Sequence, residues 1–184
     1  MKLAALAAAV SFLAASPVLA ALPVGAKAPT FSAPSFLAGK PQEFNLAQAL
    51  RTGPVVLYFF PAAHTQGCNI EAHLFAQAID KFRAEGATVV GVTAGNVNQV
   101  GSFSAETEHC AGQFPVVADA GAVIARLYDA TLALPMPMGS VSNRTSYVIA
   151  PNDKVIFVYS NLKPEDHITL TLDAVEKWRS EHAK

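Results

Sequence analysis

The sequence predicts an α/β fold with a mixed central β-sheet and helices on both faces. Residues 55–60 are a continuous apolar run rich in β-forming residues, which is typical of a strand buried on both faces of a sheet, and residues 88–92 are a second run that fits a buried strand. Each run is followed by apolar residues at helical spacing, which predicts helical crossovers between neighbouring strands. Two later strands, at 145–149 and 155–159, flank a turn-forming Pro-Asn-Asp sequence and should pair antiparallel.

The segment ahead of the first buried strand is expected to be mostly irregular, because residues 23–45 contain four prolines. The strand at 55–60 ends at Pro61, and a loop follows it. The next helix is predicted by apolar residues that recur on one face, namely Ile70, Leu74, Phe75, Ala78, Ile79 and Phe82. Gly86 is placed to end this helix.

A second helix is expected from about 97 to 110, because apolar or small residues recur there every three or four positions, at Val97, Val100, Phe103, Thr107 and Cys110. The later elements are a short strand at 116–118, a short helix at 123–128, a loop at 132–139, the strand pair already described and a helix that begins at 164. The element order β-α-β-α-β-α-β-β-α is the layout of a thioredoxin-like fold. The pattern alone also admits other three-layer α/β folds.

The composition limits the classes of function. The 184 residues include 13 basic and 14 acidic side chains and have a formal net charge of -1, which argues against nucleic-acid binding. A content of 52% hydrophobic and 15% charged residues argues against a disordered chain. Two cysteines cannot form a disulfide-dense small fold or a four-cysteine zinc site.

Residues 1–20 have the pattern of a secretory signal peptide. Lys2 is followed by a long apolar run that ends at the small residue Ala20. A membrane anchor is the alternative, but the segment is barely long enough to span a bilayer and is rich in alanine, which drives insertion weakly. We therefore expect cleavage after Ala20 and a mature domain at 21–184, secreted to the bacterial periplasm, where a disulfide can persist.

Cys68 is the most informative residue, because it lies at the start of the helix that follows the strand at 55–60. Unpaired backbone N–H groups and the positive end of the helix dipole meet at such a position and favour the thiolate, the reactive form of cysteine. Ligands of α/β folds bind where helices follow central strands. The alternative is that Cys68 is a buried packing residue, as free cysteines often are.

The segment from Pro61 to Cys68 resembles the active-site motif of the peroxiredoxin family, Pro-x-x-x-Thr-x-x-Cys, with Thr65 at the threonine position. Three further features resemble this family, especially its bacterioferritin-comigratory or Q-type branch. They are the opening Val24-Gly25-x-x-Ala28-Pro29-x-Phe31, the acidic Glu71 after the motif, and Arg144-Thr145 before a late strand. The resemblance runs from about residue 24 to the C-terminus and implies a thioredoxin-like fold.

The resemblance implies a role for each motif residue. Cys68 would be the peroxidatic cysteine, which attacks a peroxide oxygen and becomes sulfenic acid. The hydroxyl of Thr65 would accept a hydrogen bond from the peroxide and donate one to the thiolate. Arg144 would hold the thiolate and stabilise charge on the breaking O–O bond, and Pro61 would pack over the sulfur. Without the resemblance, Arg144 would be interpreted as a surface ion-pair residue at a strand start.

The second cysteine departs from the Q-type pattern. That branch often has a resolving cysteine five residues after the first, and His73 occupies this position here. Cys110, on the helix expected at 97–110, resembles the resolving cysteine of the thiol-peroxidase branch, which lies on the equivalent helix. Cys110 also falls on one apolar stripe with Val100 and Phe103, so a packing role is the alternative.

The chain is expected to work without a metal or an organic cofactor. His64, His73 and His109 lie near the two cysteines in the sequence, but no spacing among these residues matches a zinc-binding pattern. The chemistry that the resemblance implies needs no metal, haem or flavin.

These features predict a thiol-dependent peroxidase that reduces hydrogen peroxide or organic hydroperoxides. Its partners would be the peroxide and an external thiol reductant, either a thioredoxin-like protein or a small thiol, with no nucleic acid and no membrane after signal cleavage. The protein would be a monomer or a homodimer. Two alternatives stay open: a thioredoxin-like thiol–disulfide oxidoreductase, which the lack of a Cys-x-x-Cys motif disfavours, and a non-catalytic redox-sensing module.

Overall fold

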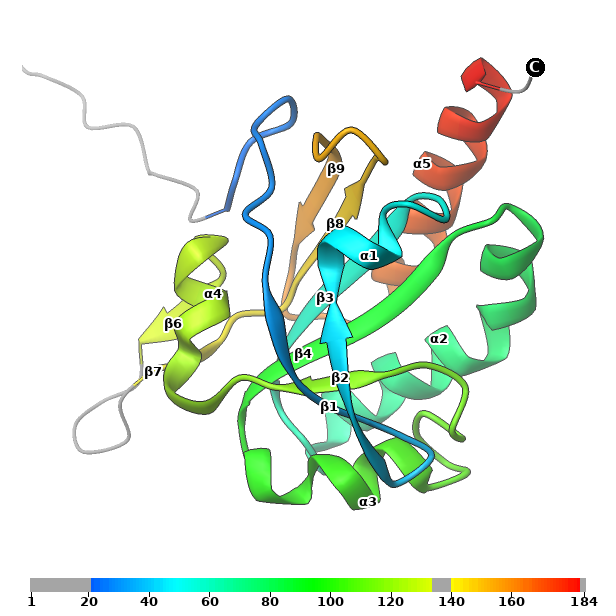
Figure 1. Ribbon diagram of the computed structural model, residues 1–184. Coiled ribbons are helices and arrows are strands. Elements are labelled where there is room, and N and C mark those ends of the chain that lie inside the picture. Colours follow the sequence, from blue (N-terminus) through cyan, green and yellow to red (C-terminus); the bar gives the residue numbers. More distant parts are fainter. Residues whose placement is uncertain (1–20, 134–139, 183–184) are drawn as a thin grey trace, which may run out of the picture.

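The computed structural model describes residues 21–133 and 140–182, which form a mixed α/β fold (Figure 1). The central sheet in this part of the chain has seven strands. Their order is β2 (Lys40–Asn45), β1 (Ser32–Leu37), β5 (Val116–Ala118), β4 (Thr88–Gly95), β3 (Val55–Ala62), β8 (Thr145–Ile149) and β9 (Val155–Ser160). The pairs β3–β4 and β4–β5 are parallel and the other neighbouring pairs are antiparallel, which confirms the predicted mixed sheet.

Helices cover both faces of this sheet, as predicted. One face carries α1 (Leu46–Ala49) and α4 (Val123–Leu127), and the other carries α2 (Gln66–Ala84), α3 (Val100–Ala105) and α5 (Glu165–His182). Short 3₁₀ turns, Val97–Gln99 and Ala120–Ala122, precede α3 and α4. Helices α2 and α5 pack side by side, and Figure 1 shows them on the opposite side of the sheet from α4.

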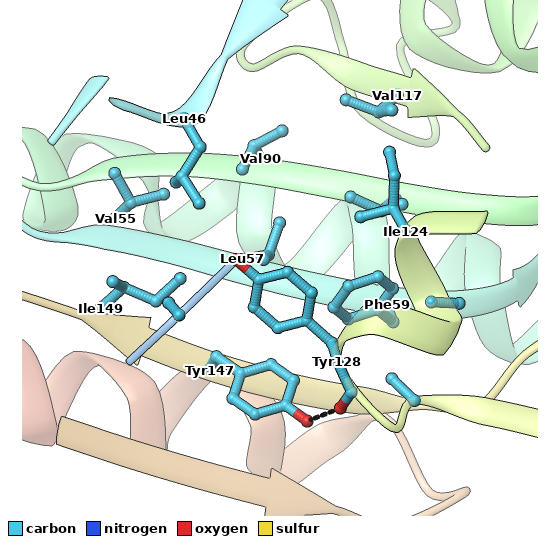
Figure 2. Close-up of a cluster of buried hydrophobic side chains, with 14 of the residues drawn as sticks. Leu46, Val55, Leu57, Phe59, Val90, Val117, Ile124, Tyr128, Tyr147 and Ile149 are labelled. Carbon is cyan, nitrogen blue, oxygen red and sulfur yellow. Dashed lines mark hydrogen bonds between the residues drawn. The ribbon is translucent and has the colours of Figure 1, made fainter. Parts of the chain in front are cut away.

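The central strand β3 separates two apolar core clusters. Its side chains alternate between them, with Val55, Leu57 and Phe59 on the α1–α4 side and Val56, Tyr58 and Phe60 on the α2–α5 side. All six have an exposed fraction of 0%, which explains why the run is apolar without a break. Burial of each aliphatic or Phe side chain contributes roughly 1.5–3 kcal/mol. Figure 2 shows the α1–α4 cluster, where the Tyr147 hydroxyl donates to the backbone oxygen of Tyr128 at 2.6 Å.

The expectation that residues 23–45 are mostly irregular is wrong for the second half of this segment. Strands β1 and β2 form a β-hairpin whose turn residues, Ala38 and Gly39, have φ angles of 51° and 75°. Two left-handed residues are what a tight two-residue hairpin turn requires. The prolines are tolerated because Pro41 lies on the edge strand β2 and Pro34 lies outside the short pairing of β1 with β5.

The helix expected at 97–110 is shorter than predicted. Helix α3 ends at Ala105. The hydroxyls of Ser102 and Ser104 donate to backbone oxygens one turn earlier, at 3.0 and 2.8 Å. Such local hydrogen bonds compete with the helical pattern. Cys110 therefore lies in the turn after the helix and not on the helix itself, although it is fully buried as its apolar stripe indicates.

The other predicted strands and helices are present, with ends that differ by a few residues. An additional two-stranded sheet pairs β6 (Thr131–Ala133) with β7 (Ser140–Ser142), so the loop expected at 132–139 begins inside a strand. The rest of that loop, 134–139, and the predicted leader at 1–20 lie outside the described residues. Within the described residues, no helix combines the length and the hydropathy that a membrane crossing requires.

Candidate active site

The first turn of α2 places Cys68 close to the end of β3. Strand β3 ends at Ala62, and Thr65 is the last residue before the helix. The first helical hydrogen bond joins the N–H of Asn69 to the oxygen of Thr65 at 2.8 Å. The N–H groups from Gln66 to Cys68 precede this bond and have no partner within the helix. Cys68 is a free thiol with an exposed fraction of 1%.

Strand pairing brings Arg144 to the same place. Strand β8 runs antiparallel to β3, and its first residue, Thr145, pairs with Phe59 near the end of β3. Arg144 precedes Thr145, so its side chain extends to the start of α2. There its Nη2 donates to the Cys68 sulfur at 3.4 Å. The pairing of these two strands therefore joins a residue from late in the chain to the predicted reactive cysteine.

Three hydrogen bonds fix the guanidinium group of Arg144. Its Nε donates to the backbone oxygen of Leu162 at 2.9 Å, its Nη1 donates to Glu71, and its Nη2 donates to Cys68. A Cβ atom at Gly67 would lie 3.1 Å from Nη2, so only a glycine leaves this approach unhindered. Arg144 has an exposed fraction of 4%, so the interpretation of it as a surface residue is wrong.

Glu71 is the buried acidic partner of Arg144 and lies one helical turn after Cys68. Burial raises the pKa of Glu71 to about 8, although the adjacent Arg144 acts in the opposite direction. Burial also acts against the charge of Arg144, but the neighbouring Glu71 and Cys68 raise its pKa, so it stays protonated. The Cys68 sulfur and the Glu71 carboxyl group therefore share one fixed positive charge.

His167 extends this buried network and was not predicted from the sequence. Its Nε2 donates to the backbone oxygen of Asn161 at 2.9 Å, so its Nδ1 accepts from the Ser146 hydroxyl at 2.7 Å. The same Nδ1 lies 3.7 Å from Glu71 Oε1, an atom without a hydrogen-bond partner among the described residues. Burial lowers the pKa of His167 to about 4. His167 lies eight residues, about two helical turns, before the apolar Val175, and this spacing was the signal available in the sequence.

Pro61 lies near the end of β3, before the loop that leads to Cys68, and Thr65 is the last residue of that loop. The Thr65 hydroxyl donates to the Ala62 oxygen at 3.0 Å, and no hydrogen bond among the described residues joins it to Cys68. The Thr65 side chain is exposed, so a small molecule can reach its hydroxyl. Pro61 is half-buried, and its backbone oxygen accepts from the Thr93 hydroxyl at 3.3 Å.

Cys110 belongs to the same apolar core cluster as Cys68, and it too is a free thiol. It lies in the turn after α3, which a hydrogen bond of 2.9 Å from Ala111 N–H to the Glu106 oxygen helps to close. Burial raises the pKa of the Cys110 thiol far above its ordinary value, so Cys110 stays a thiol while this turn is closed.

Comparison with known proteins decides the family. The family model described as "AhpC/TSA family" matches residues 24–158. The chain belongs to the AhpC/TSA family.

The curated proteins to which the chain is similar are chloroplastic peroxiredoxins Q. This similarity confirms the predicted placement near the Q-type branch of the peroxiredoxins. That of Sedum lineare is 32% identical over 124 residues, which are 67% of this chain and 63% of the relative. That of Gentiana triflora is 32% identical over 120 residues, 65% of this chain and 52% of the relative. The chain thus spans between half and two thirds of the length of these relatives.

Solved structures agree with this assignment to the AhpC/TSA family. The crystal structure of peroxidoxin BcpB from Mycobacterium tuberculosis is 29% identical, with a TM-score of 0.71 over 84% of this chain and 96% of that chain. AhpC of Mycobacterium tuberculosis has a TM-score of 0.73 over 89% of this chain and 97% of that chain. At 16% identity this second likeness shows the fold alone. The predicted thioredoxin-like fold class is confirmed.

The segment that matches the AhpC/TSA family does not contain the whole buried network. Cys68, Glu71 and Arg144 lie within residues 24–158, whereas His167 lies in α5, beyond that range. The helix that follows the family segment therefore contributes a side chain that packs within 3.7 Å of the Glu71 carboxyl group.

Proposed function

We propose that this chain is a thiol-dependent peroxidase in which Cys68 reduces hydrogen peroxide or an organic hydroperoxide. The main evidence for this proposal is the hydrogen bond of 3.4 Å from Arg144 Nη2 to the Cys68 sulfur at the start of α2. A buried cation and the unpaired N–H groups of the first helical turn both favour the thiolate. Membership of the AhpC/TSA family supports the same chemistry, because its curated relatives here carry the name peroxiredoxin Q.

The reaction begins when the Cys68 thiolate attacks one oxygen of the peroxide. A sulfur–oxygen bond forms while the oxygen–oxygen bond breaks, and the leaving oxygen takes the hydroperoxide proton to become an alcohol or water. The sulfur is oxidised to a sulfenate, which takes a proton from solvent to become sulfenic acid, and the peroxide is reduced. Arg144 stabilises the negative charge that moves from the sulfur to the leaving oxygen. Thr65 offers a hydroxyl that orients the peroxide, and Pro61 limits the access of water.

In the second step Cys110 acts as the resolving cysteine. Its thiolate attacks the sulfur of the sulfenic acid, a disulfide bond forms and the sulfur–oxygen bond breaks, and the leaving hydroxide takes a proton from solvent to become water. Both sulfurs are buried and lie in different turns of the chain, so we expect the first turn of α2, and the turn after α3 with it, to open as the bond forms. An external thiol, from a thioredoxin-like protein or a small molecule, then reduces the disulfide and restores both cysteines.

Residues 1–20 form a cleaved secretory signal peptide in this proposal, and the enzyme works in the bacterial periplasm. The basic Lys2, the apolar run and the small Ala20 support this. The similar peroxiredoxins Q are chloroplastic by name, so export is a property to be tested for this chain. Expression in a Gram-negative host should yield periplasmic protein that begins at Ala21. Full-length protein retained in the cytoplasm would contradict export.

Peroxide consumption with a thiol reductant in excess tests the proposed activity. The wild-type protein should turn over, and Cys68→Ser should lose turnover while it keeps its fold, because only sulfur is exchanged for oxygen. Cys110→Ser is the matched variant, and it should still consume the first equivalent of peroxide. A wild-type protein that is oxidised once and is not turned over by any thiol would be a redox sensor, which would contradict the proposal.

A further inference from the structure

A second polar cluster, made of His64, Glu106 and His109, lies between the two cysteine-bearing segments. His64 belongs to the loop between β3 and α2, and the other two residues belong to the turn after α3. The Nδ1 atoms of His109 and His64 lie 3.0 and 3.9 Å from the same carboxylate oxygen, Glu106 Oε2. One ligand atom from each of the three residues lies within 4.8 Å of the others. None of these side chains takes part in the proposed peroxidase reaction.

The hydrogen bonds of His64 leave the lone pair of its Nδ1 free. The Ser102 hydroxyl gives its only hydrogen to the backbone oxygen of Gln99 at 3.0 Å, so it accepts from His64 Nε2, also at 3.0 Å. The proton of the neutral His64 ring is therefore on Nε2. Metal-binding histidines are commonly oriented in this way, by a hydrogen bond to the ring nitrogen that does not bind the metal.

His109 holds a buried Nδ1 atom that makes no hydrogen bond among the described residues. Its ring stacks on Phe103, with centroids 5.1 Å apart and planes at 19°, and only 9% of its side chain is exposed. Glu106 Oε2 is close to this Nδ1 but lies off the direction in which the ring nitrogen can donate. Buried polar atoms without a partner are uncommon in folded proteins, and a bound ion is one way to satisfy such an atom.

The distances from the Glu106 oxygen to the two histidine nitrogens suit a tetrahedral metal ion. An ion bound at about 2.0–2.1 Å sets its ligand atoms about 3.3 Å apart. The two observed distances, 3.0 and 3.9 Å, lie on either side of this value. The Glu106 side chain is 48% exposed, so it can adjust and solvent can supply a fourth ligand. Two imidazoles and one carboxylate suit Zn²⁺ and similar transition metals better than Ca²⁺ or Mg²⁺.

We propose that His64, Glu106 and His109 bind a divalent transition-metal ion, for which Zn²⁺ is the best match. The expectation of no metal site came from the spacing of histidines and cysteines alone. That spacing could not show that the His64 loop and the turn after α3 meet in the fold, or that Glu106 completes the set of ligands.

The bound ion would clamp the loop that leads to Cys68 against the turn that holds Cys110. Both segments are expected to open when these two cysteines form a disulfide, so Zn²⁺ should slow disulfide formation after the first reaction with peroxide. This consequence rests on the proposed function, whereas the binding site itself does not. Binding can therefore be tested without peroxide.

Calorimetric titration of ZnCl₂ into the untagged, full-length Cys68→Ser, Cys110→Ala variant tests the site in the absence of thiol ligands. We expect one ion per chain. On this background, His64→Ala and His109→Ala should each weaken Zn²⁺ binding by roughly 10–100-fold or more, and Ser102→Ala by about 10-fold because it orients His64. His182→Ala is the matched control, an exposed histidine in α5 outside the cluster, and it should bind Zn²⁺ as the parent does.

Two results would overturn the proposal: no Zn²⁺ binding to a parent variant whose circular dichroism shows that it is folded, or binding that His64→Ala and His109→Ala leave unchanged. If the double cysteine variant does not fold, Cys68→Ser replaces it in the same titration, because the remaining Cys110 is fully buried in the core. A protein without peroxidase activity that still binds Zn²⁺ through these residues would separate a failure of the proposed function from a failure of this site.

Discussion

At the scale of single residues, Arg144 determines the chemistry available to Cys68. Its three hydrogen bonds reach a sulfur, a carboxyl group and a backbone oxygen, so the planar guanidinium is fixed in one orientation. A lysine would keep the positive charge but could not make these three bonds in one plane. Both the charge and its position are therefore needed at the Cys68 sulfur.

Arg144→Ala should lower the rate of the reaction with peroxide by about 100–1000-fold, the usual cost of losing a donor that stabilises developing charge. Arg144→Lys should fall between this variant and the wild type. Stopped-flow measurement of peroxide consumption gives the rates. Arg126→Ala, at an exposed arginine on α4, serves as the control. Unchanged rates in Arg144→Ala would return Arg144 to a structural role.

At the scale of elements, the long buried strands and helices follow from local patterns, and the remaining features depend on tertiary contacts. The apolar run of β3 and the spacing along α2 place Cys68 at a helix start from sequence alone. The β1–β2 hairpin was missed because its prolines are tolerated only by its place at the sheet edge. The contact of Arg144 with Cys68 depends on the pairing of β8 with β3, and the place of Cys110 depends on where α3 ends. Periodicity predicts neither feature.

Cys110→Ala should separate the two steps of the proposed reaction, because Cys110 lies on a different turn from the peroxide site. The variant should react with the first equivalent of peroxide as the wild type does. It should then form no internal disulfide and accumulate sulfinic acid at Cys68 when more peroxide is added, unless a small thiol is present. Peptide mapping by mass spectrometry measures each product. If the oxidised wild-type protein retains a free Cys110 thiol, Cys110 is a packing residue and Cys68 works as a single redox cysteine.

At the scale of the whole molecule, two buried ionisable groups next to Arg144 make folding depend on pH in opposite directions. The folded protein holds the Glu71 proton more tightly than an unfolded chain does, and it holds the His167 proton less tightly. Each difference appears in the free energy of unfolding over the pH range between the folded and unfolded pKa values.

Glu71 should make the wild-type protein less stable as the pH rises. Because its pKa is raised from 4.5 to about 8, its favourable contribution is complete below pH 4.5 and is lost as the pH rises through about 8. Glu71→Gln cannot titrate and should lack this decline. Denaturant unfolding of both proteins across this range measures the difference. Parallel stability curves for the two proteins would show that Glu71 is ionised throughout.

His167 should make the wild-type protein less stable as the pH falls. Its pKa is lowered from 6.5 to about 4, so its contribution is present above pH 6.5 and is lost as the pH falls through about 4. The stability advantage of the wild type over His167→Asn should shrink by roughly 3 kcal/mol at most over this range. His182→Asn, at an exposed histidine in the same helix, is the control in the same unfolding series. A constant advantage of the wild type would show that His167 is not neutral in the fold.

Peroxide should oxidise Cys68 before any other residue. The most direct measurement is mass spectrometry of the reduced, full-length protein after one equivalent of hydrogen peroxide, with peptide mapping and a trap for sulfenic acid. We expect the trapped sulfenic acid, or one end of an internal disulfide with Cys110, to lie at Cys68, and Cys68→Ser to leave Cys110 as a free thiol. Oxidation of Cys110 while Cys68 keeps its free thiol, or no oxidation of either cysteine, would show that Cys68 is not the residue that reacts with peroxide.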